Sequence, residues 1–295
     1  CITMSGTNGL LDIFLALVQP GDNVLLPEPY FPLYPPDVVI CGGEPNLYPC
    51  TFENGFVPTI EDLRSRVDEN TVAILYNFPS NPTGGNVNES QRDELVTFAM
   101  ENDLWIISDE VYDRIVYDGP HVSFLGAGYD KVIMVQSFSK TFAMTGWRIG
   151  YLLSPDAQAM LQLTKMQYYV TACSNDAMQH AVLEALVNAP DYPEEMCSEF
   201  KDRRDLVCER LNAMPGVSCH VPTGAFYVFP KVDVPGMNSE EISMALLEGG
   251  VLCSPGTAFG ELGEGHLRFA YTIAREDIDK GMDRVEAVLA ELRGD

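Results

Sequence analysis

The sequence predicts an α/β fold, in which helices sandwich a mostly parallel sheet and a smaller α+β unit follows toward the C-terminal end. Short apolar runs at 72–76, 104–107 and 132–135 have the length of buried strands, and helical patterns at 60–66 and 89–102 are interspersed with them. Strands that alternate with helices form crossover units and hence parallel sheets. Because the runs are almost continuously apolar, we expect both faces of the sheet to be covered.

The N-terminal part adds a helix and a short strand to this scheme. Residues 10–18 have the spacing of a helix that ends at the Pro-Gly pair 20–21, and residues 23–26 form a strand. The turn before the helix, Ser5 to Gly9, is a candidate phosphate site, because a helix N-terminus offers free N–H groups. An ordinary strand-to-helix turn is the alternative. Residues 1–4 resemble the end of a strand, so we expect the chain to lack its natural beginning.

Aromatic side chains and a helix cap complete this part of the chain. Tyr30, Phe31 and Tyr34 lie in a predicted loop, where they either pack or offer a face on which a flat ring stacks. Asn88 and Gln91 have the spacing of a capping box at the start of the helix 89–102.

The pattern becomes mostly helical after residue 155. Helices are predicted at 156–168, 175–188, 192–214, 239–248 and 276–292, and short strands at 217–219, 225–229, 251–253 and 266–270. This alternation is typical of an α+β unit. We place the domain boundary inside the helix 192–214, which divides the chain into a large cofactor-binding domain, 1–200, and a small C-terminal domain, 201–295.

Composition excludes several classes of function. The 295 residues carry 18 Lys+Arg against 43 Asp+Glu, a net charge of −25, which argues against binding to nucleic acid or an anionic membrane. No apolar run approaches the length of a membrane span, and no signal peptide opens the sequence. The eight cysteines show no metal-ligand spacing, so we expect no metal site and reduced, mostly buried thiols in a cytoplasmic protein.

A lysine follows one of the predicted strands. Lys140 comes just after the run 132–135, at the carboxyl end of a strand, where ligands bind in open α/β sheets. A buried, partly desolvated lysine loses its proton easily and becomes a nucleophile toward an aldehyde. A surface lysine is the alternative reading of this stretch alone.

Other polar side chains follow the neighbouring strands. Asp109 and Tyr112 follow the run 104–107, Asn81 follows the run 72–76, and Arg148 lies close in sequence to the lysine. Arg268 lies inside an apolar strand, where a guanidinium needs an anionic partner: either a structural salt bridge or a substrate carboxylate. Pyridoxal phosphate requires such a set, because it needs a lysine for its aldehyde, an anion for its ring nitrogen, donors for its phenolic oxygen and a phosphate cradle.

Six short motifs follow one another along the chain: NPTG at 81–84, SDEVY at 108–112, SFSK at 137–140, MTGWRIG at 144–150, GAFY at 224–227 and SPG at 254–256. Together they resemble the class I/II pyridoxal-phosphate aminotransferases of fold type I. The resemblance implies the large domain of that fold and a small C-terminal domain. It also implies a homodimer. Family members carry a further N-terminal segment, so the activity and dimerisation of the present chain are open at this point.

The resemblance also implies a role for each candidate residue. Lys140 resembles the Schiff-base lysine, Asp109 the partner of the pyridine nitrogen, and Tyr112 with Asn81 the donors to the phenolic oxygen; the catalytic residues are thus Lys140, Asp109 and Tyr112. The remaining residues resemble a phosphate cradle (Ser5, Gly6, Thr7, Ser137 and Arg148), a ring-stacking aromatic (Phe31, with core packing as the alternative) and binders of the substrate carboxylate (Asn81 and Arg268).

The activity implied is the transfer of an amino group from an L-amino acid to a 2-oxo acid. A carbon–sulfur β-lyase on the same scaffold is one alternative, since the chemistry diverges only after the substrate's Cα is deprotonated. An effector-binding domain of a transcription regulator is another, although the acidity of the chain argues against it. The expected partners are small molecules, and no arginine in the sequence is assignable to a second substrate carboxylate.

Overall fold

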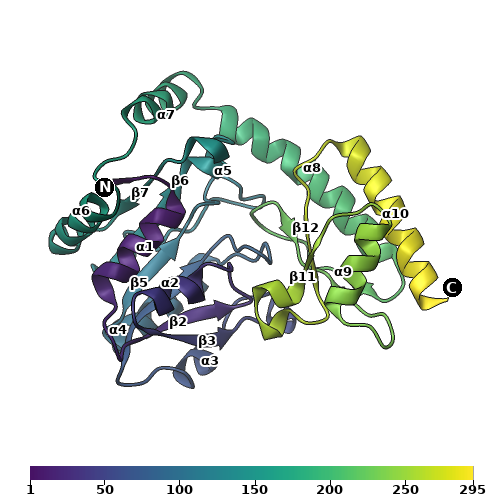
Figure 1. Cartoon of the computed structure of the whole chain (residues 1–295), viewed down its shortest axis with the longest axis horizontal. Coiled ribbons are helices and arrows are strands. Elements are labelled where there is room, and N and C mark those ends of the chain that lie inside the picture. Colours follow the sequence, from purple (N-terminus) through teal and green to yellow (C-terminus); the bar gives the residue numbers. More distant parts are fainter. Residues whose placement is uncertain (295) are drawn as a thin grey trace.

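The computed structural model describes residues 1–294 and contains one large sheet (Figure 1). Its seven strands lie in the order β1-β7-β6-β5-β4-β2-β3. The five strands from β2 to β6 run parallel, whereas β7 is antiparallel to β6 and β1 is antiparallel to β7. The predicted α/β fold with a mostly parallel sheet is therefore confirmed. The strands are β1 (Ile2–Thr3), β2 (Asn23–Glu28), β3 (Glu44–Pro49), β4 (Thr71–Asn77), β5 (Trp105–Asp109), β6 (Val132–Ser137) and β7 (Gly150–Leu153).

Helices cover both faces of this sheet because its strands are apolar on both sides. In β4, Ile74 packs in the same cluster as Leu95 and Phe98 of α4, whereas Leu75 packs with Leu10 of α1 on the other face. The two side chains point to opposite faces because successive residues of a strand alternate between its two sides. The helices around the sheet are α1 (Gly6–Leu17), α2 (Tyr34–Ile40), α3 (Ile60–Arg64), α4 (Glu89–Glu101), α5 (Phe138–Thr141), α6 (Ala157–Thr171) and α7 (Asp176–Asn188).

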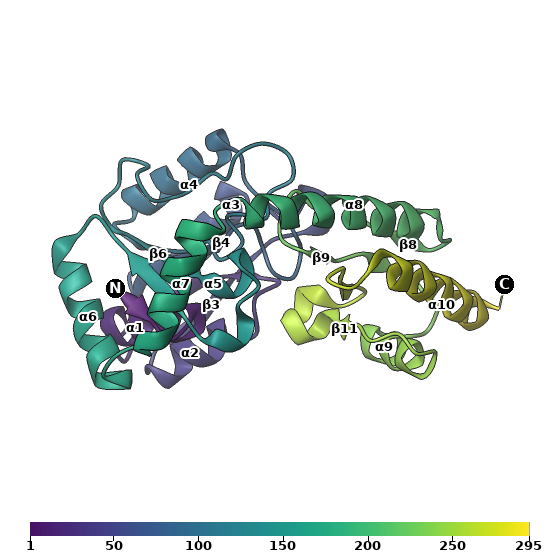
Figure 2. The same cartoon turned by 90° about the horizontal axis from the view of Figure 1, so that it is seen from above.

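The C-terminal part extends to one side of the large sheet, and its core also includes Tyr112, Ile115 and Tyr117 from the segment that follows the large sheet's strand β5 (Figure 2). Its helices α8 (Tyr192–Ala213), α9 (Ser239–Glu248) and α10 (Arg275–Arg293) pack over two small sheets, β10-β8 and β11-β12-β9. The strands are β8 (Val217–Ser218), β9 (Tyr227–Val228), β10 (Lys231–Val232), β11 (Ser254–Pro255) and β12 (Leu267–Ala270). The proposed boundary at 200/201 falls inside α8, which continues across it, and stays a prediction.

Several predicted elements need correction. The strand expected at 251–253 is wrong, because the strand β11 begins only at Ser254. The predicted loop around Tyr34 contains α2, whose two prolines occupy the first turn, where no N–H group is needed. The sheet also has a further edge strand, β3, which contains Pro45 and Pro49; proline is tolerated at the edge of a sheet. The capping box of Asn88 and Gln91 at α4 is confirmed.

The structure also tests the expectations about the thiols and about membrane spans. All eight cysteines are free thiols, but only Cys50, Cys208 and Cys219 are buried, so the expectation that most are buried is wrong. Within residues 1–294, every helix is too short or too polar to cross a membrane.

Candidate active site

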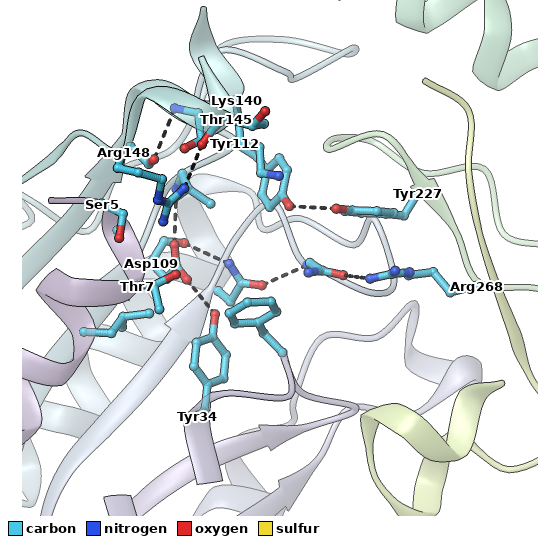
Figure 3. Close-up of a pocket in the computed structure, with 18 residues that line it drawn as sticks. Ser5, Thr7, Tyr34, Asp109, Tyr112, Lys140, Thr145, Arg148, Tyr227 and Arg268 are labelled. Atoms are coloured by element: carbon cyan, nitrogen blue, oxygen red, sulfur yellow. Dashed lines mark hydrogen bonds between the residues drawn. The ribbon is translucent and has the colours of Figure 1, made fainter. Parts of the chain in front are cut away.

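One cavity of about 350 Å³ opens at the carboxyl ends of β4, β5 and β6 and faces β9 and β12 of the C-terminal part (Figure 3). A volume of this size suits a small organic ligand. The cavity is lined by all eleven residues that the sequence singles out: Ser5, Gly6, Thr7, Phe31, Asn81, Asp109, Tyr112, Ser137, Lys140, Arg148 and Arg268. The structure thus brings these residues together, and their individual roles stay predictions.

Lys140 reaches the cavity because β6 passes directly into the short helix α5. The hydroxyl of Ser137 caps this helix by accepting the N–H of Ser139 at 3.2 Å. The Lys140 amine lies 5.3 Å from the ring centroid of Phe226 and 5.8 Å from that of Tyr112. Burial lowers the pKa of this amine, the nearby charge of Arg268 lowers it further, and Asp109 opposes both. The amine is therefore easier to deprotonate than an ordinary lysine, as a nucleophile or base requires.

Asp109 is the last residue of β5 and is only 4% exposed. Its Oδ2 accepts a hydrogen bond from the Tyr34 hydroxyl at 2.6 Å, and its Oδ1 accepts the N–H of Val111 at 3.3 Å. Burial raises the pKa of the Asp109 carboxyl to about 6, although both hydrogen bonds act in the opposite direction. Within residues 1–294 no cation forms an ion pair with it. A buried carboxylate of this kind fits a cationic ring nitrogen in the cavity.

Arg268 enters the cavity from β12 on the opposite side. Its Nη1 donates to Oδ1 of Asn81 at 2.9 Å, and its Nη2 donates to the hydroxyl of Ser254 at 3.3 Å. The guanidinium carbon lies 4.7 Å from the ring centroids of both Tyr227 and Phe259, so the group is held between two aromatic faces. Among residues 1–294 the Arg268 guanidinium has no carboxylate partner. The alternative that Arg268 forms a structural salt bridge is therefore not supported.

An anion site can form where α1 begins. The Ser5 hydroxyl accepts the N–H of Asn8 at 3.1 Å, whereas the amides of Gly6 and Thr7 belong to the first turn, which has no intrahelical acceptor. At Gly150 a Cβ atom would lie 2.8 Å from the Gly6 nitrogen, so β7 passes this turn only because the residue is glycine.

Arg148 and Ser137 line the same cavity as this turn. Arg148 has a left-handed backbone with φ 54°, and its Nη1 donates to the carbonyl of Thr145 at 2.8 Å. A guanidinium, hydroxyl groups and a helix N-terminus are together suited to a phosphate.

Sequence reasoning assigned no site role to Asn77 and Tyr227, and it indicated Tyr34 only as a packing or ring-stacking aromatic. Tyr34 donates to Asp109, as described above. Asn77 donates through Nδ2 to the carbonyl of Asp109 at 3.1 Å, and its Oδ1 accepts the N–H of Asn81 at 2.8 Å. The Tyr227 hydroxyl lies 3.1 Å from that of Tyr112. The available signals were the position of Asn77 at the end of a strand and the GAFY motif that contains Tyr227.

The chain matches known proteins over almost its whole length. The family model "Aminotransferase class I and II" matches residues 1–285. The chain belongs to this family. The chain is 40% identical to an aspartate aminotransferase of Pyrococcus abyssi over 282 residues, which are 94% of this chain and 72% of the relative. It is 39% identical to aromatic-amino-acid aminotransferase 2 of Thermococcus litoralis over 293 residues, which are 97% of this chain and 75% of the relative.

Solved structures agree with this assignment. An aromatic aminotransferase from Pyrococcus horikoshii superposes with a TM-score of 0.93 at 37% identity, covering 98% of this chain and 79% of the other. The chain is therefore an aminotransferase of fold type I, and neither the β-lyase nor the regulator alternative is favoured. The relatives' names differ in the amino acid they mention, so they do not define the substrate of the present enzyme.

Proposed function

We propose that this aminotransferase binds pyridoxal 5'-phosphate covalently through Lys140 and transfers the amino group of an L-amino acid to a 2-oxo acid. The observation that carries the proposal is the pairing of a partly buried lysine amine with a buried carboxylate in one cavity. The pKa of Lys140 is lowered by burial, and Asp109 forms no ion pair with a cation within residues 1–294. An aldehyde would react with the Lys140 amine, and a protonated ring nitrogen would pair with the Asp109 carboxylate.

The residues around the cavity fit the rest of the cofactor. Asp109 would hold the ring nitrogen, Tyr112 and the Nδ2 of Asn81 would donate to the phenolic oxygen, and the turn at Ser5, Gly6 and Thr7 with Ser137 and Arg148 would hold the phosphate. Phe31 lines the cavity and packs edge-on against Tyr34, with ring centroids 5.5 Å apart. Phe31 would therefore provide a surface for the ring while it also packs in the core, the two alternatives expected from the sequence.

The protein contributes binding, orientation and proton transfer to the reaction. When bound, pyridoxal phosphate supplies an aldehyde that captures the amino group and a ring that accepts the electron pair from Cα. Arg268 would bind the substrate α-carboxylate and thereby orient the Cα–H bond toward Lys140. The neutral Nζ of Lys140 accepts the Cα proton, and its lowered pKa favours this role. Asp109, held by Tyr34, keeps a negative charge where a protonated ring nitrogen requires it.

We also propose a homodimer in the cytoplasm. Helices α6 and α7 expose large apolar side chains, among them Tyr168 (64%), Tyr169 (73%), Leu183 (57%) and Val187 (63%). Apolar side chains concentrated on two helices are typical of a subunit interface. The eight free thiols are consistent with a reducing compartment.

The proposal is tested by adding pyridoxal phosphate to the purified chain and to Lys140→Ala. The original chain should develop the visible absorption band of a lysine-linked cofactor, and Lys140→Ala should not. Turnover with a panel of amino acids and 2-oxoglutarate should fall about 10²- to 10⁴-fold in the variant. The matched control is Lys280→Ala, which removes an exposed lysine on α10 and should leave both readouts unchanged.

Two results would contradict the proposal. One is the same visible band in Lys140→Ala as in the original chain. The other is a product mixture of pyruvate and ammonia from a cysteine conjugate without transfer to 2-oxoglutarate, which would indicate elimination instead of amino transfer.

A further inference from the structure

Tyr227 has two neighbours that belong to different parts of the proposed site. Its hydroxyl lies 3.1 Å from the hydroxyl of Tyr112, and the face of its ring contacts the guanidinium of Arg268 (Figure 3). The residue is 7% exposed and belongs to β9, next to β12. Two residues earlier, Ala225 has a left-handed φ of 58°, and the Tyr117 and Tyr271 hydroxyls both donate to its carbonyl, so this carbonyl keeps a partner when either phenol is removed.

The direction of the hydrogen bond between the two phenols determines what Tyr112 presents to the cavity. Burial raises the pKa of both hydroxyls, so both stay protonated at neutral pH. Each hydroxyl has one proton to donate, and only one of them donates in the 3.1 Å contact. If Tyr112 donated to Tyr227, its proton would be used and only lone pairs would face the ligand. If Tyr227 donates, the proton of Tyr112 is free for the phenolic oxygen of the cofactor.

We propose that Tyr227 is a positioning residue that donates its hydroxyl proton to Tyr112, so that Tyr112 donates to the phenolic oxygen of bound pyridoxal phosphate. This inference rests on the proposed function. Tyr227 has no other hydrogen-bond partner in residues 1–294, so nothing competes for its proton. A phenol that accepts a hydrogen bond is also a stronger donor, because hydrogen bonds in a chain polarise one another.

The substitution Tyr227→Phe isolates this hydroxyl. The phenyl ring remains against Arg268 and Phe226, so the packing and the guanidinium contact are kept. Without the donor, Tyr112 stabilises negative charge on the phenolic oxygen less well, and the cofactor linkage at Lys140 keeps its proton to a higher pH. The pH midpoint of the visible band should therefore rise by about 0.3 to 1 unit, as expected for one hydrogen bond.

The experiment is a pH titration of the visible spectrum of the pyridoxal-phosphate-loaded chain and four variants: Tyr227→Phe, Tyr112→Phe, the double variant and Tyr271→Phe. Tyr112→Phe should raise the midpoint more than Tyr227→Phe. The double variant should match Tyr112→Phe, because Tyr227 acts only through Tyr112. Tyr271→Phe is the matched control, since it removes a buried phenol that contacts Tyr117 and the Ala225 carbonyl but not Tyr112. Its midpoint should equal that of the original chain.

Three results would overturn the inference, and one of them identifies a failure of the proposed function. An unchanged midpoint in Tyr227→Phe would show that its hydroxyl does not support Tyr112. A double variant shifted beyond Tyr112→Phe would show that Tyr227 acts by another route. If the original chain developed no visible band at all, the proposed function itself would be wrong and the role of Tyr227 would fall with it.

Discussion

Asp109 depends on Tyr34 for its charge. The Tyr34 hydroxyl donates to the carboxylate at 2.6 Å and partly offsets the burial that raises the pKa of Asp109 to about 6 in the cofactor-free protein. In Tyr34→Phe this pKa should rise further. A protonated, neutral Asp109 does not attract a cationic ring nitrogen, so cofactor affinity is lost as pH falls through the pKa. We therefore expect affinity to fall at a higher pH in Tyr34→Phe than in the original chain.

The measurement is the dissociation constant of pyridoxal phosphate between pH 5 and 8, obtained from fluorescence titrations. At pH 6 the affinity of Tyr34→Phe should be about 10-fold lower, the size expected for losing a hydrogen bond to a charged group. The phosphate of the ligand also titrates near pH 6, but equally in every variant. Tyr30→Phe is the control, because Tyr30 makes no contact with Asp109. Identical curves for Tyr34→Phe and the original chain would contradict the assigned role.

The sequence was most informative about residues that carry their own chemical signature. Lys140, Asp109 and Arg268 were predictable because a charged side chain at the end of a strand or inside an apolar run is costly without a ligand or partner. Tyr34 and Tyr227 were not, because a buried phenol is ordinary in a core, and only the atom it touches gives it a function. Those contacts join residues 75 and 115 positions apart in the chain, a separation that no local pattern encodes.

At the scale of an element, α1 contains a buried carboxyl group that the proposed site does not use. Asp12 has 0% exposed surface, its Oδ2 accepts from Nδ2 of Asn8 at 3.3 Å, and its Oδ1 has no hydrogen-bond partner within residues 1–294. Burial raises its pKa from 3.8 to about 7. Between these two values unfolding releases a proton, so this group makes the fold less stable as pH rises, with no further change above pH 7.

The variant Asp12→Asn removes this titration while keeping the shape of the side chain. At pH 8 it should be more stable than the original chain by about 1 to 3 kcal/mol, since one pKa unit corresponds to about 1.4 kcal/mol and the cost of burying the new amide offsets part of the gain. Near pH 4 the gain should disappear. Urea unfolding at both pH values measures the difference. Asp130→Asn, which changes an exposed aspartate, should show no such pH dependence. A pH-independent effect of Asp12→Asn would assign the change to packing.

The elements themselves differed in how well local sequence encodes them. The strand β6 and the helix α4 were predictable from an apolar run and from a capping box, signals that lie within the segment. By contrast, α2 and β3 contain prolines and polar residues that normally indicate loops, and tertiary contacts override this tendency. The Tyr34 ring of α2 is fully buried, and β3 pairs with β2 over six residues. Position in the fold therefore determines these two elements more than propensity does.

At the scale of the whole molecule, the cavity lies between the large sheet and the C-terminal part, and long-range contacts hold these two parts together. Glu28, at the end of β2, accepts through Oε1 the backbone N–H groups of Glu261 at 2.5 Å and Leu262 at 3.3 Å. Arg204 of α8 binds Asp118 at 3.2 Å and the carbonyl of Pro222 at 3.0 Å. These contacts fix the C-terminal part against the large sheet. Arg268 is thereby aligned with Lys140 and Asp109, which come from the other side of the cavity.

The association of two copies is the remaining prediction at this scale. Helices α6 and α7 lie at the end of the molecule opposite α9 and α10 (Figures 1 and 2), and their exposed apolar side chains are the proposed subunit interface. Sedimentation velocity should therefore show a dimer for the original chain. A charge introduced at Tyr169 or Val187 would be desolvated in the interface at a large cost, so Tyr169→Glu and Val187→Glu should sediment as monomers at low micromolar concentration.

The control for this prediction is equally exposed but lies elsewhere. Leu252, between α9 and β11, is 84% exposed, so Leu252→Glu adds the same charge without touching α6 or α7 and should leave the dimer intact. Circular dichroism separates dissociation from unfolding, because monomeric variants should keep the helix content of the original chain. A dimer that survives both substitutions in α6 and α7 would place the interface on another face, whereas a monomeric original chain would contradict the proposed homodimer.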